Sequence, residues 1–243
     1  MLKKAGPLGL WLAIGWAGFV VLPWYAQSRG LLDVGWLLAW DRQGPAPGLQ
    51  QALLHGRLWL LPLILPLALP LVLIGRRQDT PAAAWLLLGS GVVGVVWLLG
   101  QGFAVVHNGW GFDFLEAWFG PIEVRQYGIG AGASLTLLAF LMFIAQGLAA
   151  RGAVNGDRFV VGAITLIVAL VLAFIFFPVG RILTGALQGE DGGLAIGLFV
   201  ERFLDPRIWG LGCLQGAPSC GVAWNTLALA ITTGALTTLL GLA

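Results

Sequence analysis

Six stretches of the chain run for 18 residues or more without an Asp, Glu, Lys or Arg side chain. They are Ala5–Ser28, Leu58–Gly75, Thr80–Phe112, Gln126–Ala150, Phe159–Gly180 and Ile208–Ala243. The hydrocarbon core of a bilayer is about 30 Å thick, and an α-helix crosses it in about 20 apolar residues. A charged side chain inside that core costs at least a few kcal/mol. The pattern therefore predicts an all-α, polytopic membrane protein with about six transmembrane helices.

The composition agrees with this interpretation. Hydrophobic residues make up 58% of the chain and charged residues 10%, whereas soluble domains carry about 25% charged residues. A soluble fold of 243 residues needs a polar surface that this composition does not supply. The net charge of +2 is too small to indicate a nucleic acid as a partner. The partner that the composition implies is a lipid bilayer.

The charged residues predict the orientation of the chain. The expected spans are residues 8–26, 58–74, 81–106, 127–149, 159–179 and 223–243. Six basic residues against two acids give a net charge of +4 over 22 residues in the short segments 1–7, 75–80 and 150–158. Seven arginines against nine acids give −2 over 94 residues in the three longer loops. Because cytoplasmic loops are enriched in Lys and Arg, we expect a cytoplasmic N-terminus, with the longer loops outside.

The two cysteines, Cys213 and Cys220, both fall in the last outside loop. An oxidising compartment permits a disulfide there, and closing so short a ring would constrain the loop by roughly 2–3 kcal/mol. The loop 212–221 is otherwise rich in Gly and Pro, so we assign this pair as a disulfide candidate. Two unpaired thiols are the alternative. A metal pair is disfavoured because the loop contains no His or acid.

Few residues could carry catalytic chemistry. His55 and His107 stand near expected span ends, but a transition-metal site usually needs three or four converging ligands. The metalloprotease, hydrolase and nucleotide-binding motifs are missing. No ionisable residue lies in the middle of an expected span, where proton relays and ion-coupled carriers place one. We therefore expect no enzyme, and we assign no catalytic, cofactor-binding or metal-binding residue.

Polar and small residues inside the spans have structural explanations. Threonines in membrane helices bond back to their own backbone, and other polar side chains hold helices together. The polar set is Gln101, Ser134, Thr136, Gln146, Thr232, Thr233, Thr237 and Thr238. Three prolines spaced four apart, Pro62, Pro66 and Pro70, should bend the second span. Gly128-x-x-x-Gly132 matches a pattern for close helix packing, and 107–126 is predicted to be a short amphipathic segment on the membrane surface.

Three strings in the second half of the chain resemble a known family. They are Phe176–Leu183 (FFPVGRIL), Phe199–Trp209 (FVERFLDPRIW) and Trp224–Ala230 (WNTLALA). Together they resemble the opening of an ABC importer permease, most closely the ferric-iron type of bacteria. In that family a first helix ends in a Pro-containing apolar run, and an outside loop carries an Asp-Pro-Arg-like element. Long members carry extra helices first, which Gln51–Leu61 and Gln146–Asp157 resemble.

The resemblance implies a fold, a function and two partners. The permease would form the membrane pathway for a small solute, ferric iron or a similar cargo, delivered by a periplasmic solute-binding protein. A separate cytoplasmic ATP-binding subunit would hydrolyse ATP. The protein would be a multi-pass protein of the bacterial inner membrane. Residues 1–157 would form an N-terminal four-helix membrane extension, and residues 158–243 would begin the transmembrane domain of the permease.

One element of the family is missing from the sequence. The cytoplasmic coupling loop, with its Glu-Ala-Ala-like motif, lies downstream of the Asn-Thr-Leu helix, so we expect this chain to be an N-terminal fragment of a longer permease. A non-catalytic membrane scaffold or assembly subunit is an alternative that shares the physical features above. A membrane-embedded lipid enzyme is a third, but it would need acids, His or Arg clustered at one interface, and the acids here are dispersed over three loops.

Overall fold

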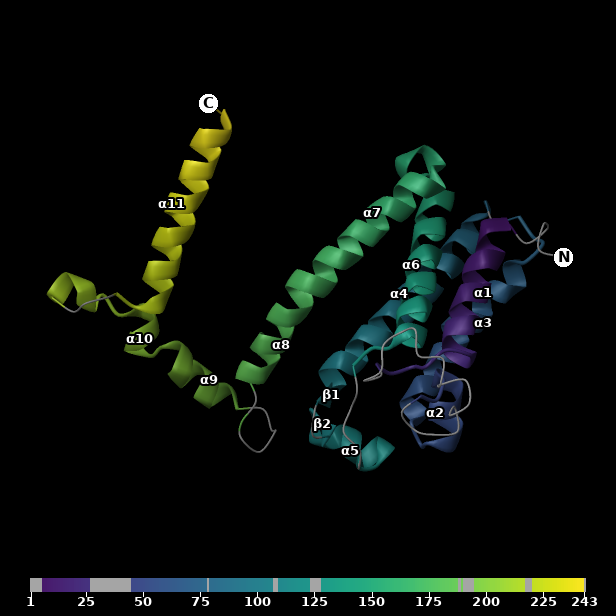
Figure 1. The fold of residues 1–243 in the computed structure, drawn as a ribbon, viewed down its shortest axis with the longest axis horizontal. Helices are drawn as coiled ribbons and strands as arrows, with labels where there is room; N and C mark the ends of the chain where they lie inside the picture. Colours follow the sequence, from purple (N-terminus) through teal and green to yellow (C-terminus); the bar gives the residue numbers. More distant parts are fainter. Residues whose placement is uncertain are drawn as a thin grey trace. The chain divides into compact units, whose positions relative to one another are not determined.

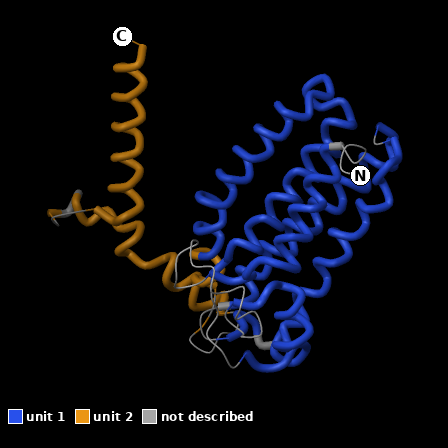
Figure 2. The backbone as a smooth tube through the Cα atoms, turned by 45° about the vertical axis from the view of Figure 1, so that its right-hand side comes forward, with its two compact units in different colours: residues 1–181 blue, residues 182–243 orange. Residues whose placement is uncertain are grey.

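The computed structural model describes residues 6–26, 45–77, 79–106, 109–122, 128–187, 189, 195–216 and 220–242. The structure is 79% helical, with almost no strand. It divides into two compact units, residues 1–181 and 182–243 (Figure 2). The domain boundary expected after residue 157 therefore falls inside the first of these units.

The first unit is a bundle built around one central helix (Figure 1). The α-helices are α1 (Gly6–Val20), α2 (Gly48–Leu54), α3 (Ile64–Ala68), α4 (Pro81–Ala104), α5 (Asp113–Phe119), α6 (Ala131–Ala150), α7 (Arg158–Val171) and α8 (Phe177–Ala186), the last of which continues into the second unit. Three 3-10 segments are η3 (Leu58–Leu63), η4 (Leu69–Leu73) and η5 (Ala153–Gly156), and a π-helical turn is η6 (Leu172–Phe176). Two short antiparallel strands are β1 (Val105–Val106) and β2 (Gly109–Trp110).

The central helix is α6, which packs against α1, α4 and α7. Close approach explains why glycines lie at these contacts, because a Cβ on Gly18 would come within 2.6 Å of the Gly132 carbonyl oxygen. On the other side of α6, a Cβ on Gly94 would meet the Phe140 ring at 2.5 Å. Small residues let membrane helices pack where apolar side chains gain nothing over lipid. The expectation for Gly128 is wrong, however, because α6 begins only at Ala131 and Gly128 precedes the helix.

The end of the bundle where α1 ends and α6 begins is closed by extended backbone. Residues after α1 pair with the segment before α6, through the hydrogen bonds Ala26 N to Gly128 O (2.7 Å) and Gly130 N to Trp24 O (2.9 Å). A third bond runs from Trp24 N to Ala46 O at 3.3 Å. These bonds satisfy peptide groups that leave the helices, as buried backbone requires.

The second expected span, which contains three prolines, is mostly 3-10 helix and not a bent α-helix. Residues 58–73 form 3-10 turns on either side of a single five-residue α-helix. In a 3-10 helix the carbonyl of Trp59 would accept from residue 62, but Pro62 has no N–H. The indole Nε1 of Trp97 on α4 donates to this carbonyl instead, at 2.8 Å. The neighbouring helix thus replaces the donor that proline removes.

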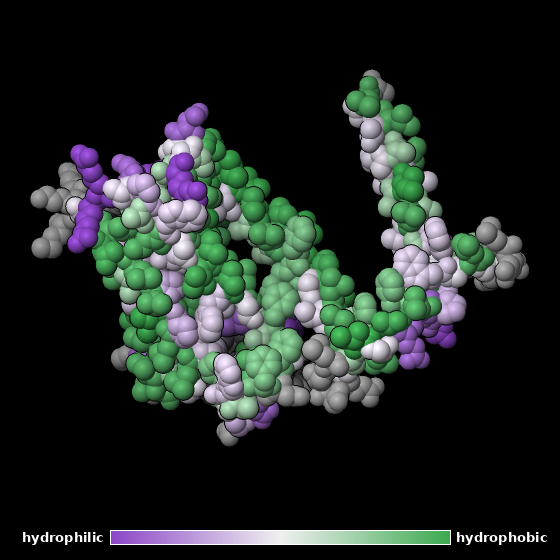
Figure 3. All heavy atoms as spheres, turned by 180° about the vertical axis from the view of Figure 1, so that it is seen from behind, coloured by the Kyte–Doolittle hydropathy of each residue, from purple (hydrophilic) through white to green (hydrophobic). Residues whose placement is uncertain are grey.

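Four helices in the described part of the chain are long and apolar enough to cross a membrane. They are Pro81–Ala104, Ala131–Ala150, Arg158–Ala186 and Val222–Leu242. The apolar segments Pro7–Val20 and Leu58–Leu73 are shorter, so the expected count of six is not confirmed. Figure 3 shows hydrophobic atoms over much of the flank of the first unit and hydrophilic atoms gathered at one end. This surface is that of a membrane protein.

The second unit contains little buried surface. Its elements beyond α8 are α9 (Ile196–Phe203), α10 (Pro206–Trp209), the 3-10 turn η7 (Gly212–Gln215) and α11 (Val222–Leu242). No residue of the described α11 is buried, so the whole circumference of this helix is left for lipid or another helix to cover.

Candidate functional site

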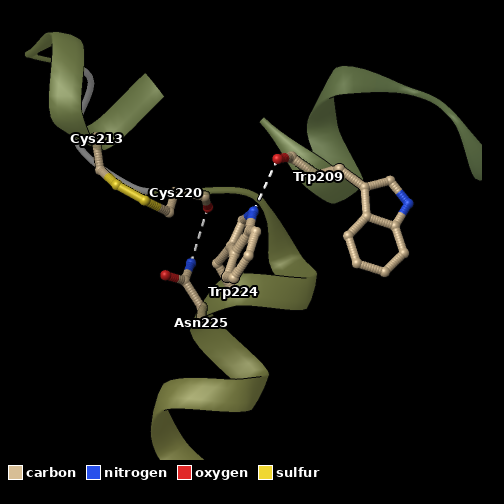
Figure 4. The surroundings of a disulfide bond; sticks show 5 residues. All are labelled: Trp209, Cys213, Cys220, Trp224 and Asn225. Carbon is tan, nitrogen blue, oxygen red and sulfur yellow. Dashed lines mark hydrogen bonds between the residues drawn. A yellow bond between two sulfur atoms is a disulfide. The ribbon is translucent and has the colours of Figure 1, made fainter. Parts of the chain in front are cut away.

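The segment leading into α11 is the most highly organised part of the second unit (Figure 4). The structure joins Cys213 and Cys220 in a disulfide with Cα atoms 4.6 Å apart. The Asn225 side chain donates to the Cys220 carbonyl oxygen at 2.9 Å. The Trp224 indole donates to the Trp209 carbonyl oxygen, also at 2.9 Å. The first turn of α11 is thereby tied to the second cysteine of the disulfide and to the last residue of α10.

Helix α10 owes its start to an Asp-Pro pair. The Asp205 carboxylate accepts from the Arg207 backbone N–H at 2.7 Å, which is the usual capping bond of an N-terminal Asp. Pro206 occupies the first helical position, where its missing N–H costs no intrahelical bond. The Trp209 indole then donates to the Phe203 carbonyl oxygen at the end of α9, at 2.8 Å. These bonds fold the FVERFLDPRIW string into one compact corner.

The threonines of α11 bond to their own helix. Thr232 donates to the Ala228 carbonyl oxygen, Thr237 to that of Thr233 and Thr238 to that of Gly234, each at 2.8 Å. This is the behaviour predicted for threonine in a membrane helix. These hydroxyls therefore need no ligand to account for them.

The polar residues expected inside the bundle of the first unit separate into two groups. Thr136 is fully buried and donates to Gly132 O (2.9 Å) and, across to α1, to Gly15 O (3.3 Å). Ser134 bonds only to Gly130 O, at 2.8 Å. The amide nitrogens of Gln101 and Gln146 are buried without a hydrogen-bond partner among the described residues. Thr136 thus joins two helices, while the two glutamines have unused donors.

The structure describes one of the two histidines. His55 lies just after α2, and its Nε2 is buried without a hydrogen-bond partner in the described part of the chain. His107 lies outside the described residues. Within those residues, no three His, Cys, Asp or Glu side chains gather as metal ligands would.

An aromatic and cationic cluster near the start of α6 was not anticipated from the sequence. The buried Arg57 guanidinium lies 4.2 Å from the centre of the Tyr25 ring and 6.0 Å from that of Trp59. Spacing carries no signal for a cluster drawn from two segments that lie about 30 residues apart in the chain.

The opposite end of the first unit carries basic anchors. Arg158 Nη2 lies 3.4 Å from Asp79 Oδ1, which joins two of the short segments expected in the cytoplasm. The Arg151 guanidinium lies 4.0 Å from the centre of the Trp85 ring. Arg and Trp both favour the membrane–water interface, so this end is suited to that boundary.

Comparison with protein-family models, with curated protein sequences and with solved structures finds no match to this chain. The geometry provides membrane helices, a basic end and a crosslinked turn, and no described cluster of nucleophiles, acids or metal ligands.

Proposed function

We propose that this chain is a membrane permease component of an ATP-driven ABC importer in the bacterial inner membrane. It carries ferric iron or a similar small solute that a periplasmic binding protein delivers, and a separate cytoplasmic subunit hydrolyses ATP. The observation that supports this most directly is the corner of the second unit. There the Asp205-Pro206 helix start and the Trp224-Asn225 start of α11, which carry the family resemblance, are hydrogen-bonded into one turn.

The proposal includes six membrane crossings with a cytoplasmic N-terminus. Segment 58–73 has six and five residues in 3-10 turns and five in an α-helix. At rises of about 2.0 Å and 1.5 Å per residue it is roughly 30 Å long, the thickness of the hydrocarbon core. Helix α1 covers about 22 Å, and the extended residues that follow it complete the crossing, with backbone groups paired as a bilayer demands.

Thiol labelling tests the orientation. In whole cells treated with a reductant, a membrane-impermeant maleimide should modify Cys213 and Cys220 without permeabilisation. Lys3 and Lys4, at the opposite side in this topology, should react with an impermeant amine reagent only after the membrane is opened. Labelling of the cysteines only after permeabilisation would overturn the orientation and the transport proposal with it.

Purification tests the function. The chain, isolated in mild detergent from its own membrane, should bring an ATP-binding subunit with it. Reconstituted vesicles should then hydrolyse ATP faster when the periplasmic binding protein and its solute are added outside. A stable complex that lacks any ATP-binding subunit favours the alternative, a membrane scaffold or assembly subunit, because α11 offers an uncovered helix for another subunit to pack on.

A further inference from the structure

The segment that contains α9 and α10 connects two helices of membrane-spanning length. The apolar stretch Arg158–Ala186, which ends with α8, has 29 residues and α11 has 21, so at 1.5 Å per residue they are about 43 Å and 32 Å long. A bilayer is about 30 Å thick in its hydrocarbon core and about 40–45 Å with its headgroups. When the two helices cross the bilayer, the end of α8 and the start of α11 therefore lie at the boundary between hydrocarbon and headgroups.

Both ends of this segment are hydrogen-bonded to those helix ends. Ala195, the N-cap of α9, donates its N–H to the Leu187 carbonyl oxygen directly after α8, at 2.9 Å. Gly221, directly before α11, donates to the Gly210 carbonyl oxygen directly after α10, at 2.7 Å. All four residues belong to the second unit.

The segment between these two fixed points is too short to cross a membrane. Helices α9 and α10 contain eight and four residues, so together with the two residues that join them they span at most about 25 Å. The hydrocarbon core is about 30 Å thick. The end of α8 and the start of α11 therefore lie at the same face of the bilayer, and α9 and α10 are held at its surface.

Helix α9 has one apolar and one polar face. At 100° per residue, the apolar residues fall within an arc of about 100°, which contains Ile196, Phe199, Val200 and Phe203. Glu201 and Arg202 lie on the other side of the helix and are exposed. Three of the apolar residues are exposed as well, namely Ile196, Val200 and Phe203. The described structure therefore leaves an apolar face uncovered at the depth where two membrane helices end.

The corner after α9 extends this apolar face with aromatic rings. The Phe199 and Phe203 rings stack with their centres 5.8 Å apart, and the Trp209 ring packs edge-on against Phe203 at 5.4 Å. The Trp209 indole N–H is already used on the Phe203 carbonyl oxygen, so the exposed ring presents apolar surface. Trp is enriched where membrane meets water.

We propose that α9 and α10 lie flat on the bilayer, with Phe203, Val200 and the Trp209 ring among the upper acyl chains of the phospholipids. Glu201 and Arg202 then point to water. Helices with one charged face and one face of aromatic and aliphatic residues lie in the plane of the interface, about 5–10 Å deep. Because Trp224 at the start of α11 donates to the Trp209 carbonyl oxygen (Figure 4), this anchor also fixes the depth at which α11 enters the membrane. The proposal needs only that α8 and α11 cross the bilayer, and it does not depend on the transport function.

Spin labelling of the full chain tests the proposal in vesicles of phosphatidylethanolamine and phosphatidylglycerol. The only two cysteines are joined in a disulfide, so without reductant a nitroxide reagent labels only an added cysteine. Val200→Cys places the label on the apolar face, and Glu201→Cys is the matched control on the polar face. Both native side chains are exposed, so neither change removes a packed residue. The ratio of collisions with oxygen, which concentrates in lipid, to collisions with a water-soluble nickel complex should be about fivefold higher at 200 than at 201.

The labels also distinguish lipid from the other possible occupants of the face. Equal ratios at 200 and 201 would mean that the apolar face is in water, and would overturn the proposal. A label at 200 that neither reagent reaches would mean that protein covers the face, and would overturn it as well. Ile196→Cys and Gly197→Cys repeat the comparison one turn earlier, where no described atom lies within 4 Å of a Cβ built on Gly197.

A charge on the apolar face provides a test without a label. Val200→Asp should accelerate hydrogen exchange of residues 196–204 in the same vesicles by about tenfold, because a carboxylate is costly among acyl chains. Glu201→Ala, on the face in water, should change these rates by less than about twofold. Exchange in α4 and α6 should be unchanged in both variants, which checks that the first unit is folded. Equal rates in α9 of the two variants would overturn the proposal.

Discussion

The two units use the same kinds of residue in different ways. In the first unit, Thr136 reaches across to the backbone of α1 and Gly132 allows that backbone to come close. In the second unit, Thr237 bonds only within α11, and no described atom lies within 4 Å of a Cβ built on Gly234. Half of the apolar window of α6 is buried inside the structure, and none of that of α11.

This difference shows what makes a membrane bundle hold together by itself. Apolar side chains are as well solvated by lipid as by one another, so association rests on close backbone approach and on hydrogen bonds between helices. The first unit has both. Helix α11 has its polar groups satisfied locally and is complete as a helix, but none of its described residues is buried. Lipid or another helix must therefore cover the apolar surface of α11.

The largest expected effect comes from adding one methyl group at the contact between α1 and α6. Gly132→Ala would place a Cβ 2.7 Å from the Leu22 carbonyl oxygen and 2.8 Å from that of Pro23. Backbone oxygens cannot turn aside, so we expect a loss of about 3 kcal/mol, measured as a fall in Tm in detergent. The matched change in the other unit, Gly234→Ala, should be neutral or slightly stabilising, because Ala favours a helix by about 1 kcal/mol over Gly. A neutral Gly132→Ala would contradict this view of the contact.

Reduction of the disulfide should act on the second unit only. Opening the ring between Cys213 and Cys220 should cost roughly 2–3 kcal/mol of local stability on the chain-entropy model. Hydrogen exchange of residues 205–216 and 220–226 should accelerate after reduction, or in the double variant Cys213→Ser, Cys220→Ser. Exchange in α4 and α6 should stay as it was. Acceleration throughout both units would mean that they are not independent.

The hydrogen bond from the Trp97 indole to the Trp59 carbonyl oxygen takes the place of one that Pro62 cannot donate. A double-mutant cycle can measure this compensation. Trp97→Phe removes the donor to the Trp59 carbonyl oxygen and should cost about 1–2 kcal/mol. Pro62→Ala restores an N–H at position 62, so Trp97→Phe should cost less in that background. The coupling energy between the two positions is the quantity to report. Additive effects would contradict the assigned role of Trp97.

The smallest effect expected is that of one interhelical hydroxyl. Thr136→Val keeps the shape of the side chain and removes its bonds to Gly15 and Gly132, so we expect a loss of about 0.6 kcal/mol, the average for such bonds in membrane proteins. Thr237→Val, which breaks only bonds within α11, should change the Tm by less than the error of the measurement. A larger loss at Thr237 than at Thr136 would reverse the comparison.

Much of the architecture follows from the sequence because hydrophobic length is a strong signal. Long apolar helices stand at four of the six expected spans. The 3-10 turns of segment 58–73 could not be predicted, because they depend on a donor from Trp97, a residue 35 positions after Pro62 in the chain. The late start of α6 has a similar cause, since Gly128 and Gly130 are paired with residues after α1.

The pocket lined by Gln101, Arg181 and Tyr25 could not be predicted from the sequence for a different reason. Gln101 was recognised as a polar residue inside a span, but nothing in its neighbours indicates that Arg181 and Tyr25 lie close to it. Those residues are brought together by the ends of three helices and by extended backbone pairing. By contrast, the sequence strings that resemble the permease family contain Asp205 and Trp224. They single out this corner, although they do not indicate its hydrogen bonds.

The π-helical turn η6 determines where α8 points. Pro178, the second residue of α8, has no N–H to donate, and wide turns of this kind add one residue to the helix. One residue rotates an α-helix by about 100°, so the faces before and after the turn are out of phase. Deleting a single residue from 172–176 would restore the phase and swing Phe177 and Arg181 away from α4. The direction of these two side chains thus depends on the number of residues in the turn 172–176 and not on which residues they are.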